Sequence, residues 1–193
     1  PPVINFAIGS GVQTISPLTE LPAITNSGVI LDGTTQPGWS LNNPVIVIDA
    51  SLAPAGTNGI TIMGASNCVI QGLVINNGFR QGILISDFGN VVGANNNAVY
   101  GCIIGLDQTG TIAKPNINGI RINAFTDDAS NNNIVGGAAE GQRNVISGNS
   151  NGGIQTLKNV NFTVIKGNYI GTDKTGTIAV PNQGFGIAIF GSL

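Results

Sequence analysis

Short apolar runs of strand length alternate with turn residues along the whole chain. In the first 66 residues these runs are rich in valine and isoleucine and predict strands at residues 3–8, 12–15, 29–31, 45–48 and 60–62. The segments between them carry proline, glycine and asparagine, which form turns. Every proline after the first two residues falls in such a segment, where a missing N–H interrupts no strand ladder. The pattern predicts an all-β chain.

Beyond residue 66 the strands recur as coils of three short strands each. Successive coils start 29, 37 and 28 residues apart, at Asn67, Asn96, Asn133 and Asn161. We attribute the uneven spacing to the loops, because the strands keep their lengths. The chain therefore divides into N-terminal coils in residues 1–66 and regular coils, marked by asparagine and glycine, in residues 67–193.

Such a coil is too small to bury its own apolar face, whereas stacked coils bury a continuous column of side chains. Stacking places equivalent strands side by side in parallel sheets, about 4.8 Å apart. The sequence therefore predicts one domain over residues 1–193, a parallel β-helix of three strands per coil and about six to seven coils. A right-handed coil is the expected hand, since parallel crossovers are almost always right-handed.

Asparagine opens each regular coil, and we expect these side chains to stack. If the coils are in register, the amides would hydrogen-bond along one corner of the solenoid and satisfy backbone groups that a turn leaves unpaired. The predicted structural ladder consists of Asn67, Asn96, Asn133 and Asn161.

One stretch of the chain is written twice. Residues 105–116 recur 66 residues later as residues 171–182, with nine of the twelve positions identical. We call the longer segments that contain most of this repeat, residues 106–118 and 172–185, the twin loops. They should emerge from the same edge of the solenoid and form a ridge, and insertions on one face of a solenoid often carry binding.

Composition excludes several classes of protein. Charged residues make up 8% of the chain and the formal net charge is −2, so no basic surface for nucleic acid is expected. No apolar run approaches the roughly 18 residues of a membrane helix, so no membrane span is expected. Cys68 and Cys102 lie in strand-like runs, which favours buried core residues over a disulfide bridge, and the sequence leaves open whether they are free.

Several motifs resemble a known group of repeats. Residues 161–177, together with residues 11–15, 32–39 and 144–149, are similar to the right-handed parallel β-helix repeats of large bacterial extracellular proteins, which share the pectate-lyase-like superfold. The resemblance covers nearly the whole chain. It implies the β-helix fold and an extracellular or cell-surface location in bacteria. Because the group is defined by its repeats and not by one activity, it implies no catalytic residues.

The twin loops carry the most prominent candidate ligands. Asp107 with Thr109, and Asp173 with Thr175, lie at matching positions and could bind a sugar or calcium. The competing interpretation is that Asp-x-Thr-Gly is a turn whose aspartate accepts backbone hydrogen bonds, and we favour it. Trp39 could stack on a sugar ring, or it could fold back over the first coil.

The remaining ionisable residues give no clear active site. Asp127 and Asp128 are an adjacent pair that could chelate a hard cation, although a solvated loop explains them as well. A glycoside hydrolase needs paired carboxylates, about 6.5–9.5 Å apart in an inverting enzyme. A polysaccharide lyase on this fold would need a base, for which Arg80 and Arg121 are the candidates. Histidine is absent, which removes the commonest general base and metal ligand, and we assign no catalytic residue, metal or cofactor.

These observations favour a non-enzymatic structural or adhesive module outside the cell, with an enzyme left open. The chain ends one strand into a coil without a polar cap, so either it continues as a longer solenoid or its subunits stack end to end. Its expected partners are itself, segments of other surface proteins, or polysaccharide. The alternative is a β-helix that binds or degrades polysaccharide. A flat threonine-lined binding face is disfavoured because Thr61, Thr156 and Thr163 are irregularly placed.

Overall fold

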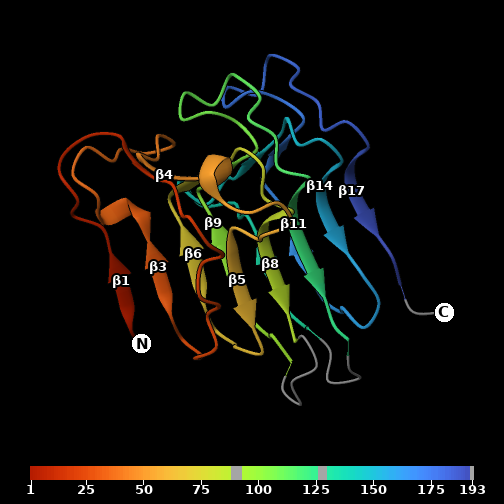
Figure 1. The fold of residues 1–193 in the computed structure, drawn as a ribbon. Helices are drawn as coiled ribbons and strands as arrows, with labels where there is room; N and C mark the ends of the chain where they lie inside the picture. The colour runs from red at the N-terminus through yellow and green to blue at the C-terminus, as the bar shows by residue number, and fades with distance from the viewer. Residues whose placement is uncertain (88–92, 126–129, 192–193) are drawn as a thin grey trace.

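The fold is a parallel β-helix (Figure 1). The computed structural model describes residues 1–87, 93–125 and 130–191. Its only helical elements within these ranges are two single 3-10 turns, η1 (Gly33–Thr35) and η2 (Ala50–Leu52). The strands, in chain order, are β1 (Val3–Asn5), β2 (Gln13–Ile15), β3 (Ile30–Asp32), β4 (Ile46–Asp49), β5 (Ile60–Met63), β6 (Val69–Gln71), β7 (Leu73–Asn76), β8 (Gln81–Ser86), β9 (Ala98–Tyr100), β10 (Ile103–Ile104), β11 (Asn118–Asn123), β12 (Ile134–Val135), β13 (Val145–Ile146), β14 (Gly152–Thr156), β15 (Val164–Ile165), β16 (Tyr169–Ile170) and β17 (Phe185–Ile189).

The strands form three sheets, and each coil of the chain contributes one strand to each sheet in turn. Sheet A has the order β1-β3-β6-β9-β12-β15, sheet B β2-β4-β7-β10-β13-β16 and sheet C β5-β8-β11-β14-β17. All pairs between these strands are parallel, and the first coil reaches sheet C through a single bridge between Ile24 and Ile62. The predicted architecture of three strands per coil is confirmed.

A column of apolar side chains from each sheet fills the interior. On sheet C, for example, the strand register stacks Ile60, Ile83, Ile120, Ile154 and Ile187. Most of these side chains are fully buried, and burying one isoleucine contributes about 1.5–3 kcal/mol. Because neighbouring coils cover the inner members of this column on both sides, stability comes from the stacking of coils.

Buried asparagines hold the coils together at all three corners. In the ladders before sheets A and B, and at Asn182 before sheet C, Oδ1 accepts a backbone N–H of the preceding coil, as Asn97 does from Cys68 and Asn144 does from Cys102, both at 2.9 Å. The Oδ1 atoms of Asn116 and Asn149 accept no hydrogen bond from the described residues. The Nδ2 groups donate to carbonyl oxygens, such as Val99 for Asn144. The members of these ladders are Asn97 and Asn133 before sheet A, Asn144 and Asn168 before sheet B, and Asn116, Asn149 and Asn182 before sheet C.

The ladder predicted from the coil starts differs from this arrangement. Pairing of Val69 with Ala98 places Asn67 and Asn96 together one residue outside the inner ladder, where both have left-handed backbones with φ near 60°. Of the four predicted members only Asn133 belongs to the inner ladder. Asn161 donates its backbone N–H to Oδ1 of Asn131 in a second, outer row. Residues 131–133 are three consecutive asparagines, so the sequence pattern could not select the register.

Both cysteines occupy positions that asparagines take in the following coil. The register aligns Cys68 with Asn97 and Cys102 with Asn144. The two thiols are free and buried, and burial raises the pKa of Cys102 to about 12. They act as small core residues at the points where two ladders end.

Among the described residues, no helix has the length and apolar character needed to cross a membrane.

Replacing Asn144 with alanine should lower the free energy of unfolding by about 2 kcal/mol, because the N–H of Cys102 would be left buried without a partner, whereas the carbonyl of Val99 would keep the N–H of Gly136. Chemical denaturation measures the effect. The matched control is Asn161→Ala, since that side chain is exposed and should change stability by less than about 0.5 kcal/mol. Equal losses in the two variants would contradict a special role for the ladder.

Candidate functional site

The twin loops use their aspartates to hold their own turns. Asp107 accepts hydrogen bonds from the Thr109 hydroxyl at 2.7 Å and from the N–H groups of Thr111 and Ile112 at 3.1 and 3.0 Å. Asp173 is only 1% exposed and accepts the equivalent hydrogen bonds. Both of its carboxylate oxygens accept from the Thr175 hydroxyl, and Oδ1 also accepts from the N–H groups of Thr177 and Ile178. A ligand at either carboxylate would have to displace these bonds, so the geometry agrees with the turn interpretation.

Hydrogen bonding also sets the acidity of these groups. Burial by itself would raise the pKa of Asp107, but the N–H of Ile112, the Thr109 hydroxyl and the N–H of Thr111 together lower the pKa below its ordinary value. The pKa of Asp173 is lowered in the same way. Both carboxylates are therefore stabilised in the charged form, which is the form that organises the loop.

The twin loops lie side by side although a whole coil separates them in the stack (Figure 1). The N–H of Lys174 donates to the carbonyl of Gly110 at 2.9 Å. Together the loops cover the outer face of sheet B, where Leu106 packs in a second apolar cluster. The strand residues of that cluster form one row in register, consisting of Val47, Val74, Ile103, Val145 and Tyr169. The predicted ridge is confirmed, and it serves to bury this row.

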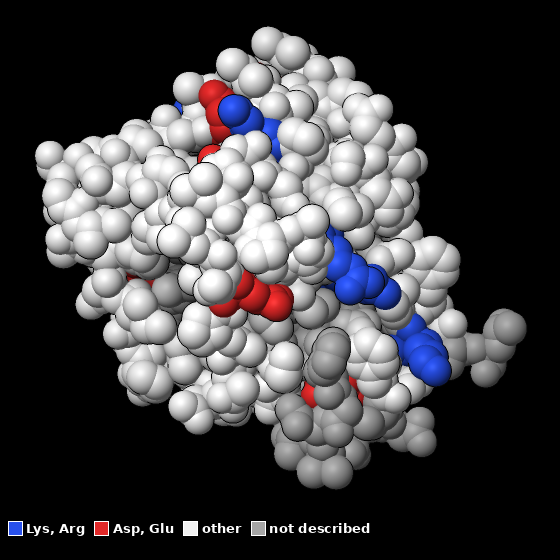
Figure 2. All heavy atoms as spheres, viewed as in Figure 1, with Lys and Arg blue, Asp and Glu red and all other residues white. Residues whose placement is uncertain are grey.

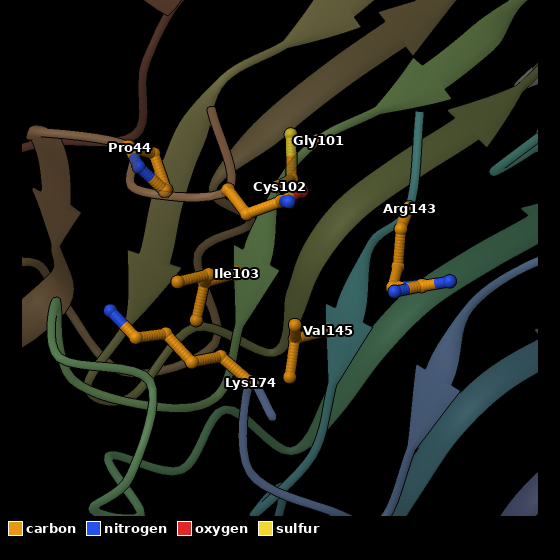
Figure 3. A pocket seen from close by; sticks show the side chains of 8 residues that line it. Pro44, Gly101, Cys102, Ile103, Arg143, Val145 and Lys174 are labelled. Atoms are coloured by element: carbon orange, nitrogen blue, oxygen red, sulfur yellow. The ribbon is translucent and has the colours of Figure 1, made fainter. Parts of the chain in front are cut away.

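A cavity of about 40 Å³ remains beside this cover, with Ile103 and Val145 in its lining (Figure 3). Its two cations point away from each other in Figure 3 and are already engaged. Arg143 donates from Nε to the carbonyl of Gly167 and lies 4.2 Å from the centre of the Tyr169 ring, while Lys174 Nζ is 3.4 Å from an oxygen of Asn43. The cavity is too small for a sugar ring, so we do not assign the site here.

The outer face of sheet C, in contrast, is hollowed. Two adjoining hollows of about 430 and 340 Å³ share Glu20, Asn58 and Leu84 and extend across β5, β8 and β11. We call them together the sheet C groove. The polar side chains that matter for its chemistry are Glu20, Asn58, Thr61, Arg80, Gln81, Arg121 and Asn123.

Several buried polar atoms in the sheet C groove have no hydrogen-bond partner within the described part of the chain. They are Asn58 Oδ1, Thr61 Oγ1, Gln81 Oε1, Arg121 Nε and Asn123 Oδ1. A buried polar atom without a partner costs about 1–3 kcal/mol, and native proteins keep few of them. Similar atoms occur elsewhere in the described chain, at Asn76, Asn116, Asn149 and Thr163, but the groove collects five of them on one face.

Charge is also concentrated in the groove. Two causes lower the pKa of the Arg121 guanidinium. The first is its burial, and the second is the positive charge of Arg80 nearby. Glu20 is held in place because its Oε1 accepts two hydrogen bonds from Asn58, at 3.1 and 2.9 Å. Figure 2 views this side of the molecule and shows that charged side chains are otherwise sparse on it.

The described part of the groove lacks the pair of carboxylates that glycoside hydrolysis needs. Glu20 is the only carboxylate among its described lining residues, whereas hydrolysis requires a pair. No cluster of three or more His, Cys, Asp or Glu side chains suited to a metal ion occurs among the residues described. Asp127 and Asp128 lie outside those residues, so their predicted role as a cation pair stays a prediction.

Sequence reasoning identified two of the residues in this groove, Arg80 and Arg121, and missed the rest. Glu20 and Asn58 come from separate turns and meet only because the chain preceding Ile24 lies beside the start of β5. Trp39, proposed as a platform for a sugar ring, is half-buried in the turn after η1, where its backbone N–H donates to the backbone carbonyl of Gln36. It is not among the residues that line the groove.

Fold and groove together define a parallel β-helix with one covered sheet face and one polar, open one. No protein-family model, curated protein or solved structure matches the chain.

The variant Asp107→Ala should lower the free energy of unfolding by about 1 kcal/mol at pH 7, a value reduced by solvent at the surface. Because the folded-state pKa of Asp107 lies below its ordinary 3.8, this stabilisation is present above that value and is lost as the pH falls through the lowered pKa. Denaturation at pH 7 and below pH 3 measures the difference, which should shrink in acid. The exposed Glu140→Ala is the control, and a loss independent of pH would contradict the assignment.

Proposed function

We propose that this protein is a non-enzymatic adhesive module that binds a polysaccharide along the sheet C groove. The proposal is carried by the five buried polar atoms that have no partner in the described chain and that share this face. A sugar chain offers hydroxyl groups that both donate and accept, so it can satisfy amide oxygens and a guanidinium nitrogen at once. This combination favours a glycan over an apolar ligand.

Shape and apolar surface support the same ligand class. The two hollows are each of the size of a small-molecule site, and they join across three strands, which suits an extended polymer more than a compact molecule. Leu84 lies between them, and Phe125 borders the larger hollow with 58% of its surface exposed. Such side chains can pack against the C–H faces of sugar rings.

Binding without cleavage is favoured by the single carboxylate among the described lining residues. The degrading alternative would need a second acid, or a base with acidic calcium ligands, beside Arg80 or Arg121. An extracellular or bacterial cell-surface location is part of the proposal and rests on the resemblance of the repeats alone.

End-to-end assembly is a second candidate, favoured by the two outer coils. Ile187 and Ile189 on β17 belong to the inward-facing side of sheet C, yet 45% and 75% of their surfaces are exposed. Val3 and Ile4 on β1 are each 48% exposed. A strand edge with apolar neighbours is a template for pairing with another chain, and here the next coil could come from a second copy.

Binding should depend on the amides of the groove. We expect Asn123→Ala to weaken binding to the recognised polysaccharide roughly tenfold, through the loss of a buried acceptor that has no partner among the described residues, and thermal unfolding checks that the variant is folded. The measurement is calorimetry or affinity electrophoresis against a panel of purified polysaccharides. Asn5→Ala, exposed on sheet A, is the control. Failure to bind any polymer of the panel would overturn the proposal.

Assembly should depend on the exposed edge of the last coil. Light scattering across a concentration range should show growth of the particle mass for the native chain and a monomer for Ile189→Lys, because a buried lysine would oppose stacking. Ile112→Lys, on a twin loop at 61% exposure, should leave growth unchanged. A native chain that is monomeric at all concentrations would refute end-to-end stacking.

A further inference from the structure

Two arginines give the sheet C groove a charge preference. We propose that the groove selects an acidic polysaccharide, one that carries carboxylate or sulfate groups, and that an anionic group of this polymer binds between Arg80 and Arg121. This inference rests on the proposed function and specifies the chemical class of its ligand.

The placement of the arginines follows from the strand register. Arg121 lies on β11 in the outward-facing row that contains Leu84 of β8. Arg80 directly precedes β8, and its backbone is fixed by hydrogen bonds to Thr57 at 2.7 Å and from Asn118 at 3.1 Å. Both side chains line the larger hollow of the groove from neighbouring coils, and Arg121, opposite Leu84, lies about 13 Å farther along the strands than Arg80 does at its backbone.

The two arginine side chains differ in how far they are buried. Arg121 is half-buried, and its Nε is a buried donor without a partner in the described chain, so its position is restricted. Arg80 is exposed and its side chain is free to move toward a ligand. One restricted and one adjustable guanidinium can hold an anion from two sides.

Like charges in this position are unfavourable without a ligand. Guanidinium groups only donate hydrogen bonds, and carboxylate or sulfate oxygens are the acceptors that match their fork geometry. Charge-assisted bonds of this kind are about twice as strong as those to a neutral hydroxyl. An acidic polymer therefore satisfies the pair better than a neutral one does.

Glu20 sets a direction for the ligand. Its carboxylate is fixed on Asn58, at the part of the groove that both hollows share. It repels anionic groups there and favours neutral hydroxyls, so the acidic group is directed toward the arginines. The net charge of −2 means that the molecule as a whole does not attract polyanions, and selection depends on this local arrangement.

The test uses polymer pairs that differ only in charge: dextran sulfate with dextran, and hyaluronan and alginate each with its carboxyl-reduced form. We expect at least one acidic polymer to bind roughly ten times more tightly than its neutral partner, and this preference to weaken as salt is raised. Sulfated and carboxylated members distinguish the two kinds of anionic group.

Variants connect the preference to the groove. Arg121→Gln should remove most of the preference for the acidic polymer, whereas Arg143→Gln makes the same charge change on the sheet B side and should retain it. Circular dichroism and thermal unfolding confirm that each variant is folded, and Arg80→Gln provides a second, exposed test. Equal binding of acidic and neutral partners, or an unchanged preference in both groove variants, overturns this inference while leaving polysaccharide binding intact. Absence of binding to every polymer, neutral ones included, overturns both proposals.

Discussion

A stacked solenoid must satisfy backbone groups at its corners, where the chain turns and strand pairing is interrupted. In this protein asparagine side chains do so at all three corners, where most of them accept an N–H from the coil before and donate to a carbonyl oxygen. The requirement recurs with every coil, because an unpaired buried N–H or C=O is costly. Strand register, the columns of isoleucine and the placement of the loops all depend on these corners being held.

The outer face of sheet B is covered and that of sheet C is partly open, because the side chains in their outward-facing rows differ. Sheet B carries an apolar row from Val47 to Tyr169, and the twin loops cover it by reaching across the intervening coil to contact each other. The aspartates of these loops are used to shape the cover. Sheet C carries a mixed outer row of Thr61, Leu84, Arg121 and Gln155, and part of it stays open as a groove. The repeated loops are thus structural, and the unrepeated face is the candidate for function.

The sheet C groove differs from the corners in how its buried polar groups are hydrogen-bonded. The ladders satisfy buried backbone groups and leave only the oxygens of Asn116 and Asn149 without a partner in the described chain, whereas the groove has five such side-chain atoms and two like charges near each other. Such an arrangement is a cost in the free protein and an advantage when a ligand supplies the missing partners. The same contrast explains why repeats indicate the fold well and function poorly.

Local sequence features were enough to predict the solenoid. Runs of β-branched residues, turn residues and a 66-residue repeat are local features, and only stacking can bury the faces they create. The sequence did not determine the register of the asparagines, since residues 131–133 offer three equivalent choices that only strand pairing resolves. Nor could it assemble the groove from Glu20, Asn58 and Arg121, which are dozens of residues apart. Their proximity depends on loop lengths and on the path of the first coil, and these are decided by packing in three dimensions.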